Sequence, residues 1–161
     1  MNRTADYYIE KLKLQAHPEG GYYKESFRDE SSIGLDRGPR STSTAIYYLL
    51  KKDQISKLHR IKSAEVWHFY DGGPLTIVQL LEDGTVKRDK LGLDLVSGCR
   101  PQIVVPACLW FGAYMGPEAE FCLAGCTVAP GFDYKDFEMA NGKELKAKYQ
   151  EQAELISRLS P

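Results

Sequence analysis

The segment from His59 to Gly72, HRIKSAEVWHFYDG, is the part of the sequence that says most about the fold. A strand that ends at Arg60, a short polar link and a returning strand over 65–70 would bring His59 and Glu65 close together. Because side chains alternate along a strand, Glu65 shares one face with Trp67, and His68 points to the other face unless a bulge intervenes. The pattern therefore predicts a hairpin-like pair of strands that carries a histidine and a carboxylate toward one site.

The rest of the chain also favours short strands. Asp83-Gly84 between two apolar runs is a strong hairpin signal. Strands at turn-punctuated spacing are typical of a sandwich or barrel rather than of alternating strands and helices. We expect helices over 4–14 and 141–159, a polar loop over 29–41, and strands over 22–28, 42–50, 56–60, 65–70, 75–81, 85–90, 102–105, 109–114 and 120–128.

Composition and length place the chain among ordinary globular proteins. The 161 residues predict one domain over 1–161, with a barrel core over about 20–130. A chain of this size buries roughly 68–70% of its unfolded surface, which is enough for a core without staples. The formal net charge of −1 argues against nucleic acid and against anionic membranes as partners.

The four cysteines and the first residues bear on the compartment. Only Cys122 and Cys126 are close in sequence, and no second pair stands at zinc-ribbon spacing, so we expect buried free thiols. No apolar run follows Met1, which predicts that there is no signal peptide. No stretch approaches the ~20 apolar residues of a membrane-spanning helix. These features predict a cytoplasmic protein.

His59 and Glu65 can do two kinds of chemistry. A carboxylate beside an imidazole can bind a divalent metal together with it. It can also orient the imidazole and raise its basicity for proton abstraction. The alternative is an exposed histidine in a surface ion pair, which the apolar setting of Trp67 and Phe69 makes less attractive.

The same stretch resembles the first motif of the cupin superfamily. That motif has a His, a second His two residues on, a Glu, and a Gly seven residues after the Glu. This chain supplies His59, Glu65 and Gly72 at matching spacing, and Ile61 stands where the second His would be.

The second cupin motif is matched only in part. Pro106 matches its Pro, Cys108 replaces its Gly, and Phe111 replaces its His. Two of the four usual metal ligands are therefore missing, which argues against a standard metal centre of three His and one Glu.

The chain is closest to one branch, the Cupin-5 or DUF985 family. This likeness implies a mainly β, double-stranded β-helix (a cupin jelly-roll barrel) with short terminal helices, often dimeric. Its biochemical role is inferred from likeness to deoxyhexose epimerases. The matching stretches are HPEGGYY (17–23), STAIYY (43–48), 59–70, 101–113 and GCTVAPGFD (125–133).

The resemblance implies a set of roles for named residues. His59 is the expected base and Glu65 its orienter or a substrate ligand, in a site that needs no cofactor. The acid would be one of Tyr22, Tyr23, Tyr47, Tyr48 and Tyr114, and a phenol with a pKa near ~10 would need tuning for this work. The expected ligand-binding residues are Tyr22, Arg28, Tyr48, Trp67, His68, Gln102 and Trp110.

Three functions remain open from the sequence. The first is a metal-free epimerase or isomerase that acts on a small, carbohydrate-like carbonyl compound. The second is a non-catalytic barrel that binds such a molecule, suggested by Ile61 and Phe111 at ligand positions. The third is a variant metal-dependent cupin with His59, Glu65 and His68 as ligands. The expected partners are a small-molecule ligand and a second copy in a homodimer.

Overall fold

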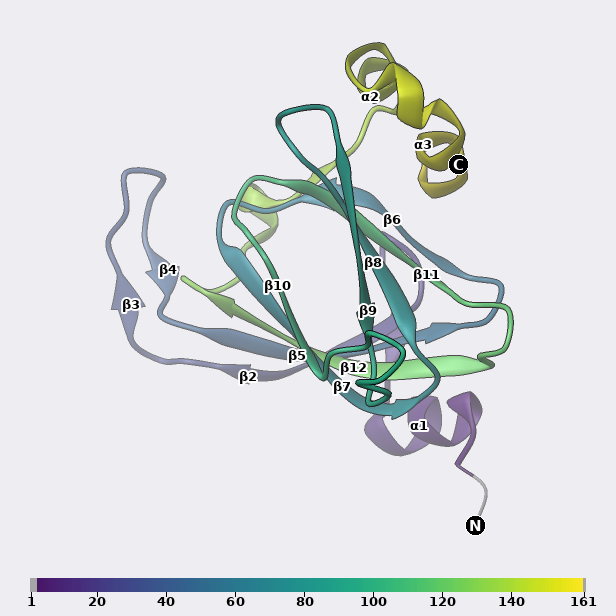
Figure 1. Cartoon of the computed structure of the whole chain (residues 1–161). Coiled ribbons are helices and arrows are strands. Elements are labelled where there is room, and N and C mark those ends of the chain that lie inside the picture. The colour runs from purple at the N-terminus through teal and green to yellow at the C-terminus, as the bar shows by residue number, and fades with distance from the viewer. Residues whose placement is uncertain (1–2, 161) are drawn as a thin grey trace.

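The computed structural model describes residues 3–160, and its strands form two facing sheets (Figure 1). In spatial order, the six-stranded sheet contains β1 (Gln15–Ala16), β2 (Tyr22–Arg28), β5 (Thr44–Lys51), β12 (Phe121–Ala129), β7 (Ala64–Gly72) and β10 (Gln102–Val105). The five-stranded sheet contains β13 (Glu138–Met139), β6 (Ile55–Arg60), β11 (Trp110–Met115), β8 (Leu75–Leu80) and β9 (Val86–Leu91). All pairings within both sheets are antiparallel. The mainly β, jelly-roll architecture expected from the sequence is confirmed.

The core lies between the two sheets. Side chains alternate along each strand, so one set from each sheet points inward. Trp67 of β7 and Tyr48 of β5 meet Phe111 of β11 in one cluster of buried side chains. Each of these three side chains is almost completely inaccessible to solvent. The expected strand over 65–70 thus delivers Trp67 to the interior.

Helix α1 (Ala5–Leu12) covers part of the outer face of the six-stranded sheet (Figure 1). The Thr4 side chain caps the helix by accepting a hydrogen bond from the Tyr7 N–H. The helix ends at Lys13, which adopts a left-handed conformation with φ 54°. The apolar stripe of α1 packs against Leu49 and Leu123 of the sheet.

The C-terminal segment covers the outer face of the five-stranded sheet. The single helical face expected over 141–159 is interrupted, because the segment forms α2 (Gly142–Lys148), a 3-10 turn η2 (Gln150–Gln152) and α3 (Ala153–Leu159). Its apolar side chains pack against the sheet residues Leu58, Val78 and Leu80; they are Leu145, Tyr149, Ile156 and Leu159.

The loop expected over 29–41 carries a small hairpin. Strands β3 (Ser32–Ile33) and β4 (Arg40–Ser41) pair with each other at the edge of the molecule (Figure 1). The 3-10 turn η1 (Tyr134–Asp136) follows β12 and leads into β13. No helix among residues 3–160 combines the length and the apolar character needed to cross a bilayer.

Candidate functional site

A cavity of about 480 Å³ opens between the two sheets. This volume is within the range of small-molecule pockets in proteins. Its lining combines buried polar side chains, those of Glu19, His59 and Glu65, with several aromatic ones. The lining residues are Gln15, His17, Glu19, Tyr23, Glu25, Arg28, Thr44, Ile46, Tyr48, His59, Ile61, Glu65, Trp67, Cys126, Val128, Phe132, Asp133, Tyr134 and Phe137.

The turn His17-Pro-Glu-Gly-Gly carries Glu19 into the cavity. Gly20 and Gly21 have φ of +110° and +76°, a conformation that L side chains rarely adopt. A Cβ on Gly20 would also collide with the carbonyl oxygen of Ile55, and a Cβ on Gly21 would lie 2.7 Å from that of Leu49. The two glycines therefore let the turn approach both sheets, which leaves Glu19 only 5% exposed.

Glu19 is the hydrogen-bonded partner of His59. Its Oε2 lies 3.0 Å from His59 Nε2, and its Oε1 accepts a 2.9 Å hydrogen bond from the Ser56 hydroxyl. On the other side of the ring, His59 Nδ1 lies 2.7 Å from the Lys57 carbonyl oxygen, which can only accept, so Nδ1 carries a proton. Both ring nitrogens of His59 are therefore engaged by the protein itself.

The charges of this pair stabilise each other. Burial alone would lower the pKa of His59, but the charge of Glu19 and its hydrogen bond outweigh burial and raise it. Burial alone would raise the pKa of Glu19, but the charge and hydrogen bond of His59, with His17 and Ser56, hold it below its usual range. Both shifts favour the ion pair of an imidazolium and a carboxylate.

His17 provides a second imidazole beside this pair. Its Nδ1 accepts a 3.2 Å hydrogen bond from the Glu19 backbone N–H, so the proton of the neutral ring is on Nε2. Burial lowers the pKa of His17, which keeps the ring neutral. None of the hydrogen bonds among residues 3–160 uses its Nε2. His17 is therefore a neutral N–H donor on the cavity wall.

Glu65 is the second buried carboxyl group of the cavity. It lies on β7 in the six-stranded sheet, whereas His59 lies on β6 in the five-stranded sheet. Its Oε2 accepts a 3.2 Å hydrogen bond from Trp67 Nε1. Burial is the main cause that raises the pKa of Glu65 to about 7, against a partial offset from the charge of His59. The expected orienter of His59 is thus a separate acid–base group, and Glu19 holds the imidazole instead.

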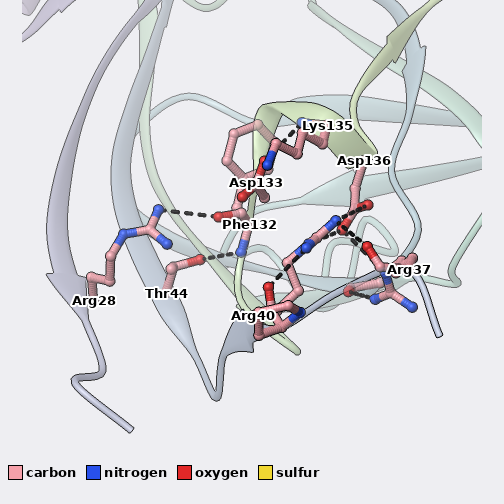
Figure 2. Close-up of polar contacts among 10 residues, drawn as sticks. Arg28, Arg37, Arg40, Thr44, Phe132, Asp133, Lys135 and Asp136 are labelled. Carbon is pink, nitrogen blue, oxygen red and sulfur yellow. Dashed lines mark hydrogen bonds and ion pairs between the residues drawn. The ribbon is translucent and has the colours of Figure 1, made fainter. Parts of the chain in front are cut away.

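Arg28 and the segment after β12 form the rim of the cavity. The Arg28 guanidinium makes two hydrogen bonds to Glu25, at 3.0 and 2.7 Å, and a third of 3.1 Å to the Phe132 carbonyl oxygen. Thr44 Oγ1 accepts a 2.9 Å hydrogen bond from the Phe132 N–H (Figure 2). Across the opening, the hydroxyls of Tyr23 and Tyr134 lie 3.3 Å apart.

A buried ion cluster holds the rim segment in place. Asp136 accepts hydrogen bonds of 2.8 and 2.9 Å from Arg40, and one of 3.1 Å from Arg37 (Figure 2). Arg37 also donates to the Ser63 hydroxyl at 3.0 Å. The hydrogen bonds from Arg40 are the main cause that lowers the pKa of Asp136. This cluster joins the β3–β4 hairpin to the 3-10 turn that carries Tyr134.

The structure brings five of the nine sequence-predicted site residues to the cavity. His59, Glu65 and Trp67 line it with Tyr48 and Arg28. The Tyr48 hydroxyl, however, donates a 2.7 Å hydrogen bond to the Gly20 carbonyl oxygen, so this phenol is used structurally.

The other four predicted residues lie outside the cavity lining. His68 Nε2 is 3.1 Å from Thr127 Oγ1, and Gln102 donates to His68 Nδ1 at 3.2 Å. Tyr22 packs in the cluster beneath α1, and Trp110 belongs to the cluster under the C-terminal helices. Of the proposed acids Tyr22, Tyr23, Tyr47, Tyr48 and Tyr114, only Tyr23 and Tyr48 line the cavity.

Several cavity residues were not predicted from the sequence as site residues, chiefly Glu19, Tyr134 and Phe137. The turn HPEGG was the available signal for Glu19, because two adjacent glycines after an acid mark a close backbone approach. Tyr134 and Phe137 follow the last predicted strand, and none of the motifs quoted from the sequence includes them.

The residues at the cupin ligand positions do not fit a metal ion. Ile61 offers no donor atom, and the Phe111 ring packs 4.1 Å from the His59 ring. Both nitrogens of His59 are engaged, and His68 lies away from His59 and Glu65. Among residues 3–160, no group of three or more His, Cys, Asp or Glu side chains is arranged to hold a metal.

Known proteins resemble this chain over nearly its whole length. A hypothetical protein from Leishmania major is 32% identical with a TM-score of 0.93, covering 98% of this chain and 99% of its own. A Shewanella oneidensis protein is 37% identical with a TM-score of 0.92, covering 99% of each chain. An uncharacterized protein of Saccharomyces cerevisiae is 33% identical over 154 residues, which is 86% of this chain and 76% of the yeast protein.

More distant structures share the fold alone. An oxalate decarboxylase from Bacillus subtilis is 18% identical with a TM-score of 0.58, covering 89% of this chain and 36% of its own. The family described as Cupin superfamily (DUF985) matches residues 6–140, which include both sheets and the cavity. This chain therefore belongs to the DUF985 family of the cupin superfamily.

Proposed function

We propose that the protein is a metal-free proton-transfer enzyme, an isomerase or epimerase of a small carbohydrate-like carbonyl compound. One observation carries this proposal: two buried acid–base groups lie on different sheets around the same cavity. Glu65 belongs to the six-stranded sheet, and the His17–Glu19–His59 group belongs to the turn and sheet opposite. Buried, shifted titratable groups in a pocket are typical of catalytic sites.

Glu65 is the proposed base. Its carboxylate takes the proton from the carbon beside the substrate carbonyl, and the electron pair of the C–H bond moves onto the carbonyl oxygen. The Nε2–H of His17 donates a hydrogen bond to the enolate oxygen that forms. In an isomerisation, Glu65 returns the proton to the former carbonyl carbon, while the proton of the neighbouring hydroxyl passes to the former carbonyl oxygen. In an epimerisation, water supplies a proton to the opposite face of the same carbon, and Glu65 releases its proton to solvent. Neither route needs an oxidant or reductant.

The pKa values favour a carboxyl group over a phenol for this step. Proton transfer is fastest when the pKa of the catalytic group lies near the working pH, and it contributes about 10²–10⁴-fold. The pKa of Glu65 is raised to about 7, while burial raises the pKa of Tyr134 to about 12. The ion pair of Glu19 and His59 has a positioning role, because the Glu19 backbone fixes the tautomer of His17.

The test is exchange of substrate C–H protons with solvent deuterium. Wild-type protein is incubated in D₂O with D-fructose, dihydroxyacetone and related keto-sugars, and NMR follows the loss of signal. We expect exchange that falls by at least about 10²-fold in Glu65→Gln. Glu138→Gln is the matched control, because Glu138 is exposed and pairs with Arg60 outside the cavity lining. Absence of exchange in wild-type protein, or full exchange in Glu65→Gln, would contradict the proposal.

A non-catalytic ligand-binding barrel is the second candidate. The engagement of both His59 nitrogens by Lys57 and Glu19 favours it, because this imidazole has no free nitrogen for a substrate. The two candidates differ in one result: a binder retains a keto-sugar without exchanging its protons.

We also propose a reducing compartment, the cytoplasm, and a homodimer. All four cysteines are free thiols, as is usual for proteins kept in reducing surroundings. The edge strand β10 exposes Val104, and the nearby loop exposes Leu93 and Val96. Exposed apolar edges of this kind are often covered by a second chain.

A further inference from the structure

The charges around the cavity show which ligands it can accept. The lining contains four carboxyl groups, against which stand the guanidinium of Arg28, paired with Glu25, and the imidazolium of His59, paired with Glu19. The carboxyl groups are those of Glu19, Glu25, Glu65 and Asp133. No lysine is among the lining residues. A cleft in which one sign of charge dominates repels ligands of the same sign.

We propose that the natural ligand is an uncharged, unphosphorylated ring compound that the aromatic rim holds. In this proposal Arg28 links β2 to the segment after β12 and does not bind an anion. This inference rests on the proposed function only in using the same cavity. It names the substrate class of that site and excludes nucleotide-linked and phosphorylated sugars.

The Nε and Nη2 donors of Arg28 are already in use. Figure 2 shows its guanidinium directed at the Phe132 carbonyl oxygen, in line with their 3.1 Å hydrogen bond. Glu25 neutralises the same guanidinium through two hydrogen bonds. A phosphate would have to displace Glu25 and face Asp133 across the rim. Arginine recognises anions through its paired donors, and here those donors are committed to Glu25.

The buried end of the cavity offers no free cation either. The imidazolium of His59 is paired with Glu19 and bonded to the Lys57 carbonyl oxygen. His17 is neutral because burial lowers its pKa. These groups suit the hydroxyl and carbonyl oxygens of an uncharged ligand, which need single donors and acceptors rather than a compensating charge.

The aromatic side chains of the rim suit a ring-shaped ligand. Phe132 and Tyr134 meet edge to face with centroids 5.0 Å apart, and Tyr134 and Phe137 do so at 5.9 Å. Tyr23 faces this group from β2, through the hydroxyl contact with Tyr134. Aromatic side chains around a few placed polar groups are typical of pockets for small, largely uncharged molecules.

The test uses the fluorescence of Trp67, which lines the cavity. A Trp110→Phe background leaves Trp67 as the only tryptophan, because the chain has two. The probes are D-fructose, D-fructose 6-phosphate and 1-amino-1-deoxy-D-fructose, which carry no charge, negative charge and positive charge on the same skeleton. Calorimetry repeats each titration. We expect D-fructose to bind at least about tenfold more tightly than either charged form.

Variants at the rim separate the effect of the Glu25–Arg28 pair from that of the aromatic ring of Tyr134. In Glu25→Gln the guanidinium is released, so binding of D-fructose 6-phosphate should improve severalfold relative to binding of D-fructose. Glu138→Gln, which breaks the exposed pair with Arg60 instead, should change neither. Tyr134→Ala should weaken D-fructose binding, and Tyr134→Phe should restore it.

Three results would overturn this inference: tighter binding of the phosphate, tighter binding of the amine, or no response to D-fructose in both measurements. The proposed enzymatic function fails in a different way, through absence of deuterium exchange in a protein that still prefers the uncharged sugar. The two failures are therefore distinguishable.

Discussion

Glu65 is the residue at which the chemistry of the site and the stability of the fold oppose each other. Glu65 is 8% exposed, and its carboxyl group accepts a hydrogen bond from the indole N–H of Trp67. Removal of a charge from water is unfavourable unless partners replace the solvent, so the folded protein favours the protonated form. A base of this kind is prepared for proton transfer by the fold that surrounds it.

This conflict predicts a pH-dependent stability. The pKa of Glu65 is about 7 in the folded state against 4.5 as an ordinary value, so the folded state keeps its proton longer as pH rises. The stabilisation that comes from the protonated Glu65 carboxyl group is fully present below the pKa of Glu65 in the unfolded state. It is lost as pH rises through the pKa of Glu65 in the folded state. Relative to Glu65→Gln, the unfolding free energy of wild type should fall by about 3 kcal/mol between about pH 4 and pH 8.

Urea denaturation of both proteins across this pH range measures the effect. Glu138→Gln should follow the wild-type curve, because Glu138 is exposed. Parallel curves for wild type and Glu65→Gln would mean that Glu65 ionises normally in the folded protein.

At Cys108 a departure from the second cupin motif has a structural consequence. It stands where the cupin motif has glycine, and its backbone has φ +67°. A left-handed residue that is not glycine costs about 1–2 kcal/mol, and the greater entropy loss of glycine on folding offsets part of that. Cys108→Gly should therefore raise the unfolding free energy by about 1 kcal/mol or less in thermal unfolding. A lower melting temperature would show that the thiol contributes more than the backbone strain.

At the scale of elements, the rim segment depends on the ion cluster of Asp136. The side chains of Asp136 and Arg40 are each 5% exposed, and breaking a buried pair leaves an uncompensated charge. Asp136→Asn should lower the unfolding free energy by about 3 kcal/mol at neutral pH. Because the Arg37 side chain is more exposed, at 26%, Arg37→Ala should lower the unfolding free energy by clearly less than Asp136→Asn does.

Asp136→Asn should also loosen the aromatic rim formed by Phe132, Tyr134 and Phe137. Denaturation and hydrogen exchange of the Tyr134 and Phe137 amides together measure stability and rim order. Equal stability of Asp136→Asn and wild type would contradict the role assigned to the cluster.

Strands of four or more residues were predictable from the sequence, and strands of two residues were not. Strands β2 and β10 have the predicted bounds, because turn residues or polar segments bracket their apolar patterns. Strands β1 and β13 have two residues each and exist only through pairing with β2 and β6. The break between α2 and α3 at Tyr149 was missed, because the apolar spacing continues across it.

At the scale of the whole molecule, the fold was predictable but half of the site was not. His59 and Glu65 were found because one motif carries both. Glu19 lies forty residues before His59 in the sequence and reaches it only when the turn docks between the sheets. The position of His68 outside the cavity follows the strand alternation expected from the sequence. The outward position of Trp110 depends on which face of its sheet is inside, and this follows from tertiary packing.

The proposed homodimer is a prediction at the same scale. Light scattering should give about twice the 18.2 kDa mass of the chain. Val104→Glu should reduce it toward one chain, because a charge on the exposed edge strand β10 opposes pairing. A wild-type mass of one chain at all concentrations would remove this proposal and leave the cavity unaffected.

The central claim is that Glu65 acts as a base in a cavity without a metal. The pH dependence of deuterium exchange into D-fructose and dihydroxyacetone tests it most directly. If the carboxylate is the active form, exchange should rise with pH, pass its midpoint near the Glu65 pKa of about 7 and level off above it. This profile should be lost in Glu65→Gln and retained in Glu138→Gln. Exchange in wild-type protein that does not depend on pH in this range, or that Glu65→Gln preserves, would contradict the account.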